Sequence, residues 1–192
     1  MAVTISVRRA FQMLANESLW QVAARVHAAL AGSGVDHAIA GGVAVFLHGY
    51  RRFTADLDLL VRREDSEPLF AAMAAAGFEW KAERKEFDSP EAIPVQLLIA
   101  GEKQGRDQET TFPSPSDASA VTTIEGLPVL SLAQLIQSKL ACGLGDPRRM
   151  HKDFADVVEL IAAHRLDGSF AGKLHKSLRK EFRELAKRAA GG

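Results

Sequence analysis

The chain has 192 residues, enough for one domain with a sizeable core, and its hydrophobic fraction of 47% and charged fraction of 25% are ordinary for a globular protein. Its formal net charge is zero, so general electrostatic attraction gives no argument for a nucleic-acid or membrane partner. The single cysteine, Cys142, excludes an intramolecular disulfide framework, and no run approaches the roughly 18 apolar residues that span a bilayer. We therefore expect a cytoplasmic protein that is not attached to a membrane.

Hydrophobic periodicity and turn residues divide the first 130 residues into helices and strands. Apolar residues at three- and four-residue steps predict helices, whereas short apolar or alternating runs predict strands. The predicted elements are, in chain order, a helix over 7–32, strands over 35–40 and 55–61, a helix over 67–76, an exposed strand over 78–87, a buried strand over 94–100, a loop over 101–118, and strands over 121–124 and 127–130. Gly77 is the expected C-cap of the second helix.

From residue 131 onward the period is helical. Ser131 is the expected N-cap of a helix over 132–142, and further helices are predicted over 149–164 and 169–189. Because strands come first and helices last, we expect an α+β fold in which helices flank a small mixed sheet. We divide the chain into an α/β core with an N-terminal helix at 1–130 and a C-terminal helical part at 131–192, packed on the same domain.

Residues 37–61 carry the strongest functional signal. They predict a strand, a Gly41-Gly42 turn, a short helix, a loop and a second strand that contains Asp56 and Asp58. Side chains two apart in a strand project to the same side, so the carboxylates converge, as suits Mg²⁺ held against a polyphosphate. Alone, Asp-x-Asp is more often the solvated face of an edge strand, and a glycine pair is more often a tight turn. Their combination favours a metal and phosphate site.

These residues resemble a known signature. The block Ala-Gly-Gly-Val-Ala-Val-Phe-Leu-His-Gly, followed by Arg-Phe-Thr-Ala-Asp-Leu-Asp-Leu-Leu-Val, is similar to that of the nucleotidyltransferase (polymerase-beta-like) superfamily, and within it to the AbiEii/MenT-like and minimal bacterial enzymes. Later blocks around Lys139 and Lys152 occur in the family's order, so the likeness covers roughly residues 35–162. The resemblance implies a nucleotidyltransferase-type mixed sheet and transfer of an NMP group from an NTP to an acceptor hydroxyl by two Mg²⁺ ions, with Mn²⁺ as an alternative.

The resemblance also implies roles for individual residues. Gly41 and Gly42 would line the triphosphate, and Asp56 and Asp58 would hold the metal ions. Lys152 would contact the triphosphate as a catalytic residue. The remaining nucleotide-binding candidates are Lys139, Arg149 and Asp153.

One helix face carries several of these candidates. At about 100° per residue, Arg149, Lys152, Asp153 and Asp156 cluster on one side of the predicted helix. With the resemblance, Asp153 or Asp156 would orient Lys152 or the cleft. Without it, this face would be the wet side of an amphipathic helix.

Gln96 departs from the family pattern. It stands where the family has a third carboxylate, in Val95-Gln96-Leu97-Leu98, and is the only polar residue of that apolar run. An amide can hydrogen-bond a ligand, but it is neither an anionic metal ligand nor a useful general base. Asp88 and Glu91, in the preceding loop, are alternative carboxylates. We keep Gln96 among the expected catalytic residues.

The leading hypothesis is therefore a Mg²⁺-dependent nucleotidyltransferase. Its acceptor could be RNA or a tRNA end, a protein hydroxyl or a small molecule, and the AbiEii/MenT likeness adds a toxin role with an antitoxin partner. The alternative, motivated by Gln96, is a catalytically impaired nucleotide-binding or partner-binding module of the same fold. A third and weaker hypothesis is a helical adaptor that works through the basic stripe of the last helix. That stripe contains Lys173, Lys176, Lys180, Arg183 and Lys187.

Overall fold

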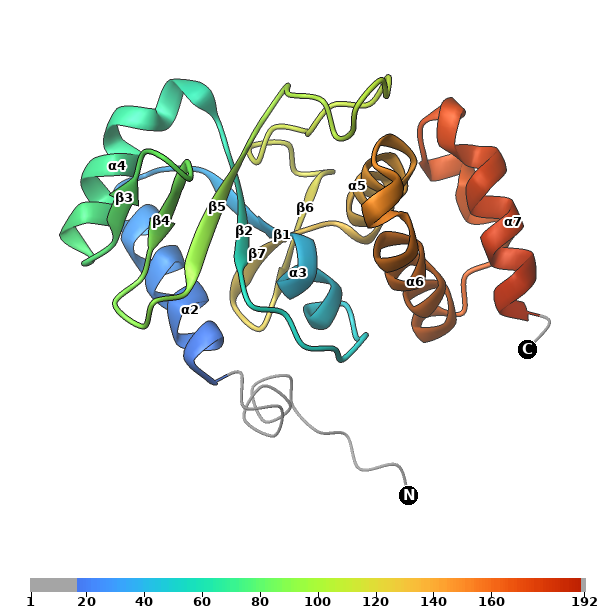
Figure 1. Ribbon diagram of the computed structural model, residues 1–192, viewed down its shortest axis with the longest axis horizontal. Helices are drawn as coiled ribbons and strands as arrows, with labels where there is room; N and C mark the ends of the chain where they lie inside the picture. Colours follow the sequence, from blue (N-terminus) through green and yellow to red (C-terminus); the bar gives the residue numbers. More distant parts are fainter. Residues whose placement is uncertain (1–16, 191–192) are drawn as a thin grey trace.

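The computed structural model describes residues 17–190 (Figure 1). Its first helix, α2 (Glu17–Gly32), buries Leu19, Val22, Val26 and Leu30, the apolar positions that recur every three or four residues. The part of the predicted first helix at 7–16 lies outside the described residues. None of the helices at 17–190 is both long and apolar enough to cross a membrane.

A seven-stranded mixed sheet forms the centre of the fold, in the order β3-β4-β5-β2-β1-β7-β6. The strands are β1 (His37–Ala40), β2 (Leu57–Val61), β3 (Glu79–Lys81), β4 (Glu86–Asp88), β5 (Pro94–Ile99), β6 (Val121–Ile124) and β7 (Leu127–Leu130). Two pairs, β1 with β7 and β2 with β5, are parallel, and the other pairs are antiparallel. This confirms the predicted α+β fold with a mixed sheet and flanking helices.

The two faces of the sheet have different environments because side chains alternate along each strand. Leu97 of β5 faces α4 (Ser66–Ala75) and lines an apolar pocket with its Leu69 and Phe70. Gln96 faces the opposite side, where it lines a cleft with residues of two C-terminal helices. These helices are α5 (Leu132–Gly145) and α6 (Pro147–His164), which pack against each other beside the sheet. A short helix, α3 (Gly41–Leu47), follows β1.

The predicted elements at the β6–β7 hairpin and at the end of α4 are confirmed. β6 and β7 have the predicted bounds, and both residues of their turn have positive φ, 51° at Glu125 and 82° at Gly126. Gly77 follows the last turn of α4 with φ 86°, the left-handed conformation expected of a glycine C-cap.

The single strand predicted over 78–87 is wrong, because the chain reverses there. β3 and β4 form an antiparallel hairpin whose turn ends at Lys85, a residue with φ of 55°. Phe87 is buried and packs against Phe70 and Trp80, with ring centroids about 5 Å away. The strand predicted as buried over 94–100 corresponds to β5, but only Val95 is fully buried and Gln96 is exposed, because one face of β5 opens onto the cleft.

The junction of α5 and α6 also differs from the prediction. α5 continues through Gly143 to Gly145. A side chain at position 143 would collide with the Phe154 ring of α6, so this glycine allows close helix packing instead of ending the helix. The break falls at Asp146, which is extended and accepts a hydrogen bond from the Arg148 N–H at 3.0 Å. Ser131 stands at the N-cap position of α5, but its hydroxyl makes no capping bond.

The single helix predicted over 169–189 is wrong in its first half. Two 3-10 helices, η2 (Gly168–Lys173) and η3 (Lys176–Leu178), precede α7 (Arg179–Ala190). The side chains of Asp167 and His175 accept hydrogen bonds from the backbone two residues ahead, which starts each short turn separately. Leu174, between them, is extended.

Candidate functional site

The corner between β1 and α3 depends on two adjacent glycines. Gly41 has φ of 55°, and a Cβ on it would overlap the carboxylate of Asp58. A Cβ on Gly42 would overlap the hydroxyl of Thr54 and lie 3.2 Å from the guanidinium of Arg52. Only glycine lets this corner approach β2 so closely. Ala40, the residue before the helix, offers no side chain to cap its first N–H groups.

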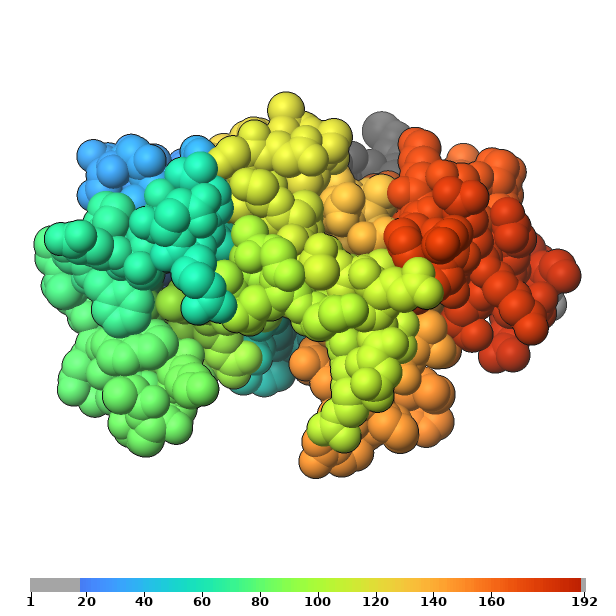
Figure 2. Space-filling view, turned by 90° about the horizontal axis from the view of Figure 1, so that it is seen from above, coloured from blue at the N-terminus to red at the C-terminus, as the bar shows by residue number. Residues whose placement is uncertain are grey.

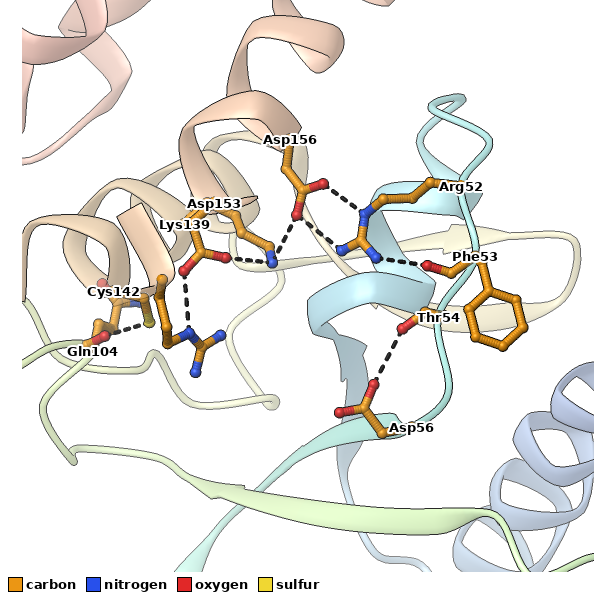
Figure 3. Close-up of polar contacts among 10 residues, drawn as sticks. Arg52, Phe53, Thr54, Asp56, Gln104, Lys139, Cys142, Asp153 and Asp156 are labelled. Atoms are coloured by element: carbon orange, nitrogen blue, oxygen red, sulfur yellow. Dashed lines mark hydrogen bonds and ion pairs between the residues drawn. The ribbon is translucent and has the colours of Figure 1, made fainter. Parts of the chain in front are cut away.

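Asp56 and Asp58 line one cleft of about 310 Å³, as the sequence predicts. Asp58 is the second residue of β2, and Asp56 directly precedes the strand. The Thr54 hydroxyl donates to Oδ1 of Asp56 at 3.1 Å (Figure 3). Burial and the neighbouring charge of Asp56 raise the pKa of Asp58, against the opposing effects of Lys139, Arg149 and Lys152. Two carboxylates that resist joint ionisation are typical of a site that a cation completes.

Cations form the opposite wall of the cleft. Arg148, Arg149 and Lys152 project from α6, Lys139 from α5, and Arg52 from the loop after α3. Lys152 and Arg148 are exposed, and the Arg149 side chain is 56% exposed, so all three are available to an anionic ligand. The cleft therefore places two carboxylates opposite a positive wall, an arrangement suited to a metal-bound polyphosphate.

A buried ion-pair network joins Lys139 and Arg52 of that wall to Asp153 and Asp156 (Figure 3). Nζ of Lys139 is 2.8 Å from Oδ1 of Asp153 and 2.9 Å from Oδ2 of Asp156. Asp156 also accepts two hydrogen bonds from the Arg52 guanidinium, at 2.6 and 2.9 Å, and Asp153 accepts one from Arg149 at 3.2 Å. The network fixes the loop carrying Arg52 to the two helices.

The charge states of this network follow from its geometry. Burial lowers the pKa of Lys139, but Asp156 and Asp153 outweigh that effect and raise it overall. Burial raises the pKa of Asp156, but its bonds to Arg52 and Lys139 outweigh that effect and lower it overall. Lys139 is therefore a cation and Asp156 an anion at neutral pH.

The structure places the predicted nucleotide-binding residues in two groups. Gly42, Lys139, Arg149 and Lys152 line the cleft, and Gly41 packs against Asp58 at its edge. Asp153 is fully buried and does not line the cleft. Asp153 and Asp156 hold Lys139 and not Lys152, so of the two roles expected for them the ion pairs agree with orienting the cleft.

Gln96 lies directly beside Asp58. The two residues are register partners in the parallel strands β2 and β5, so their side chains project to the same side. Glu86 of β4 is the register partner of Gln96 on its other side, and its carboxylate is 2.9 Å from Nε of Arg84. The site thus has Gln96 where a third carboxylate is expected, with a carboxylate one strand further away.

The two alternative carboxylates considered from sequence have other partners. Glu91 is bonded to Arg25 of α2 through both oxygens, at 2.7 and 3.2 Å, on the far side of the sheet. Asp88 is 2.6 Å from the Arg84 guanidinium and pairs in register with Pro94. Neither lines the cleft. Glu86 could not be found from sequence, because its position next to Gln96 depends on the register of β4.

Three cleft residues were missed: Arg52, Thr54 and Arg148. A signal for the first two was present, since positions 52, 54, 56 and 58 alternate and all four side chains line the cleft. Arg148 offers no such signal: it precedes the helix predicted over 149–164, whereas α6 already begins at Pro147.

The donor set fits Mg²⁺ bound together with a nucleotide. No group of three or more histidine, cysteine, aspartate or glutamate side chains in residues 17–190 is placed to hold a metal by itself. Mg²⁺ is commonly held by one or two carboxylates, with phosphate oxygens and water completing its six ligands. Asp56 and Asp58 supply the two carboxylates.

Comparison with solved structures shows the nucleotidyltransferase fold. ANT(2'')-Ia in complex with adenylyl-2''-tobramycin aligns with a TM-score of 0.56 and 16% identity, over 87% of this chain and 98% of that one. A Helicobacter pylori protein assigned as a nucleotidyltransferase aligns with a TM-score of 0.54 and 19% identity, over 94% of this chain and 80% of that one. A protein from Thermotoga maritima with the same assignment aligns with a TM-score of 0.52 and 18% identity, over 72% of this chain and 93% of that one.

Sequence comparison gives the family. A search of curated protein sequences finds no match. The profile of the family described as aminoglycoside-2''-adenylyltransferase matches residues 22–160, which is most of the chain and includes Gly41, Asp58, Gln96 and Lys152. The superfamily resemblance is thus confirmed, whereas the narrower AbiEii/MenT likeness stays a prediction. The chain belongs to the aminoglycoside-2''-adenylyltransferase family.

Proposed function

We propose that this chain is a Mg²⁺-dependent nucleotidyltransferase that moves an NMP group from an NTP to an acceptor hydroxyl. The observation that carries the proposal is the pair of carboxylates, Asp56 and Asp58, facing a wall of five cations across a cleft of about 310 Å³. A metal-bound triphosphate would supply the negative charge that balances these cations. Its oxygens would also complete the ligands of a metal ion held by the two carboxylates.

The residues divide the work of binding. The Gly41-Gly42 corner brings backbone into close contact with Asp58 and Thr54. Gly42 lines the cleft, where its backbone would meet phosphate oxygens. Lys152, Arg149 and Arg148 neutralise and orient the triphosphate from α6. Asp56 and Asp58 would hold Mg²⁺, or Mn²⁺, which neutralises charge on the transferred group and the leaving pyrophosphate. Two such ions, as the resemblance implies, would share these two carboxylates.

Gln96 sets how fast the reaction can run. Its amide lines the cleft beside Asp58, and there it would orient an acceptor hydroxyl by a hydrogen bond. It cannot take the proton. Glu86, the carboxylate next in the row, is held by Arg84. We therefore expect slow turnover, limited by proton removal.

The same observation favours one alternative function. If no group replaces the missing base, the chain is a nucleotide-binding module that retains the fold without efficient transfer. The family's name suggests an aminoglycoside acceptor, whereas the AbiEii/MenT likeness suggests RNA, a tRNA end or a protein, with an antitoxin partner. A cytoplasmic location also remains a prediction from the sequence.

The test is transfer of labelled NMP from each of the four NTPs, with Mg²⁺ titrated in, to a panel of hydroxyl acceptors. Asp56→Asn and Asp58→Asn are expected to abolish transfer and the Mg²⁺-dependent part of NTP binding measured by calorimetry. Glu159→Gln, an exposed carboxylate change on α6, is the matched control and should leave both unchanged. Activity that survives both aspartate changes would remove these residues from the mechanism.

A further inference from the structure

A second pocket, of about 410 Å³, lies beside the cleft and shares Arg149 with it. Its other walls come from the loop between β5 and β6 and from the end of α5. We infer that this pocket receives the acceptor, and that the acceptor is a small hydroxyl compound carrying a phosphate or carboxylate group instead of a polycationic aminoglycoside. The inference rests on the proposed nucleotidyl transfer and names the substrate class for it.

The position of the pocket assigns it to the acceptor. Leu98, which lines it, is two residues beyond Gln96 and on the same face of β5. The residues that would meet the triphosphate, Gly42 and Lys152, line only the first cleft. A molecule in the second pocket therefore reaches the metal-binding carboxylates from the side of Gln96, opposite the glycine corner.

The walls of the pocket are fixed by close backbone packing. A Cβ on Gly105 would overlap the carbonyl oxygen of Ala141, and a Cβ on Gly145 would overlap the backbone of Arg106. The Cys142 thiol donates to the carbonyl oxygen of Gln104 at 2.6 Å. In Figure 2 the yellow-green loop lies directly against the orange residues of the α5–α6 region. The loop is thus held on α5, and the pocket is a built feature of the fold.

The charge of the pocket opposes an aminoglycoside. Lys103, Arg106 and Arg149 line it with a single carboxylate, Asp146, and Asp146 is already bonded to Arg148 at 3.1 Å. Aminoglycosides carry several ammonium groups at neutral pH, so this lining would repel them. An anionic group would be attracted. Placing charges of the same sign as an unwanted ligand around a pocket is a common way to exclude that ligand.

A buried amide supplies the second observation. Gln104, which lines the pocket, is only 2% exposed, and neither its Nε2 nor its Oε1 has a hydrogen-bond partner among residues 17–190. Thr110, whose backbone oxygen accepts from the Gln104 N–H, has an equally unpartnered hydroxyl. Buried polar groups are nearly always satisfied, so the Gln104 amide in the pocket wall marks a place where a ligand or its bound water belongs. With Leu98 and Phe112 the lining is partly apolar, as in small-molecule sites.

The experiment measures binding to the full chain by calorimetry, with and without Mg²⁺ and a non-hydrolysable NTP analogue. The probes are ribose 5-phosphate and 3-phosphoglycerate as anions, and tobramycin as the polycation. The variant Lys103→Glu/Arg106→Glu reverses two exposed charges of the pocket, and Lys180→Glu, on α7, is the matched control. We expect an anionic probe to bind in the presence of the analogue, about tenfold or more weakly in the double variant, and equally well in the control.

Three outcomes would overturn the inference: tobramycin binding more tightly than both anions, anion binding that the double variant does not weaken, or no binding of any probe. Anion binding that the NTP analogue abolishes would also overturn it, because the probe would then occupy the nucleotide cleft. Failure of the proposed function is separate, since it shows as absence of Mg²⁺-NTP binding in the unmodified chain. In that case the response of the anionic probes to Lys103→Glu/Arg106→Glu still decides whether the pocket selects anions.

Discussion

Asp58 and Gln96 stand directly opposite each other on two parallel, hydrogen-bonded strands, and both side chains line the same cleft. Because of this position, an amide instead of a carboxylate at residue 96 changes the chemistry of the site. A carboxylate at position 96 would lie close enough to Asp58 to share a metal ion or to accept the proton of an acceptor hydroxyl. The amide brings no negative charge to a metal ion and cannot accept the proton, so the site keeps its binding wall and loses one charge.

Gln96→Asp is expected to raise kcat for nucleotidyl transfer by about 10²- to 10⁴-fold, the usual contribution of a positioned general base. The affinity for Mg²⁺-NTP should rise as well, because the new carboxylate adds a metal ligand. Steady-state transfer and calorimetry measure the two effects. Gln96→Asn, which keeps an amide, is the matched control and should gain nothing.

The activity of the unmodified chain in that experiment distinguishes the nucleotidyltransferase from the nucleotide-binding module. Activity that appears only in Gln96→Asp would favour the nucleotide-binding module over the enzyme. A kcat for Gln96→Asp equal to or below that of the unmodified chain would contradict the assignment of position 96 as the missing base. Glu86→Gln in the unmodified chain tests whether the carboxylate next in the row serves instead.

Lys139 and Lys152 both line the cleft, but replacing Lys139 is expected to lower stability, whereas replacing Lys152 is expected to weaken nucleotide binding. Lys139→Met leaves Asp153 and Asp156 buried without their shared cation, which should cost about 3–5 kcal/mol of unfolding free energy. Lys152→Met removes an exposed cation, so unfolding in urea should change little while Mg²⁺-NTP binding weakens about 10- to 100-fold. Equal loss of stability in both variants would refute this division.

The features that local sequence determines were predictable. The β6–β7 hairpin has its predicted bounds because both strands are short apolar runs around a Glu125-Gly126 turn. Asp56 and Asp58 share the cleft as predicted, although only Asp58 lies within β2, because every second residue from position 52 to 58 lines the cleft. The β3–β4 hairpin was not predictable in the same way, because its positive-φ residue is Lys85 and not a glycine or asparagine.

The features that depend on distant contacts were not predictable. Lys139 meets Asp153 and Asp156 only because α5 and α6 pack together, and Arg52 reaches Asp156 across 104 positions of sequence. Glu86 lies beside Gln96 only through the register of β4. Helical periodicity places a charged residue on a face, but it does not say which partner will cover that face.

Asp58 makes the stability of the metal-free protein depend on pH. Its pKa is raised above the ordinary value of 3.8, so the folded state binds its proton more tightly than the unfolded state does. The contribution of protonated Asp58 to the unfolding free energy is fully present below pH 3.8 and is lost as the pH rises through the raised pKa. Without divalent cations, Asp58→Asn is therefore expected to melt at a higher temperature than the unmodified chain at neutral pH.

Thermal unfolding with EDTA and then with Mg²⁺ checks this expectation. The gain for Asp58→Asn should be a few degrees, since about 1 kcal/mol moves the Tm of a chain of this size by roughly 2–4 °C. Mg²⁺ added together with a non-hydrolysable NTP analogue should raise the Tm of the unmodified chain and not that of the variant. A variant that melts lower in EDTA at neutral pH would show that Asp58 stabilises the fold in its ionised form.

Gly41→Ala is expected to damage both the fold and the site. Its φ of 55° is strained for any residue with a Cβ, and that Cβ would overlap the Asp58 carboxylate, so either β2 or the corner must move. We expect a loss of about 1–3 kcal/mol in unfolding free energy and loss of detectable Mg²⁺-NTP binding. Gly32→Ala, at the end of α2 with open space around its Cα, is the matched control and should change neither. If Gly41→Ala bound Mg²⁺-NTP normally, the close approach of the glycine corner to Asp58 would not be part of the nucleotide site, and the triphosphate would have to bind along α6 alone.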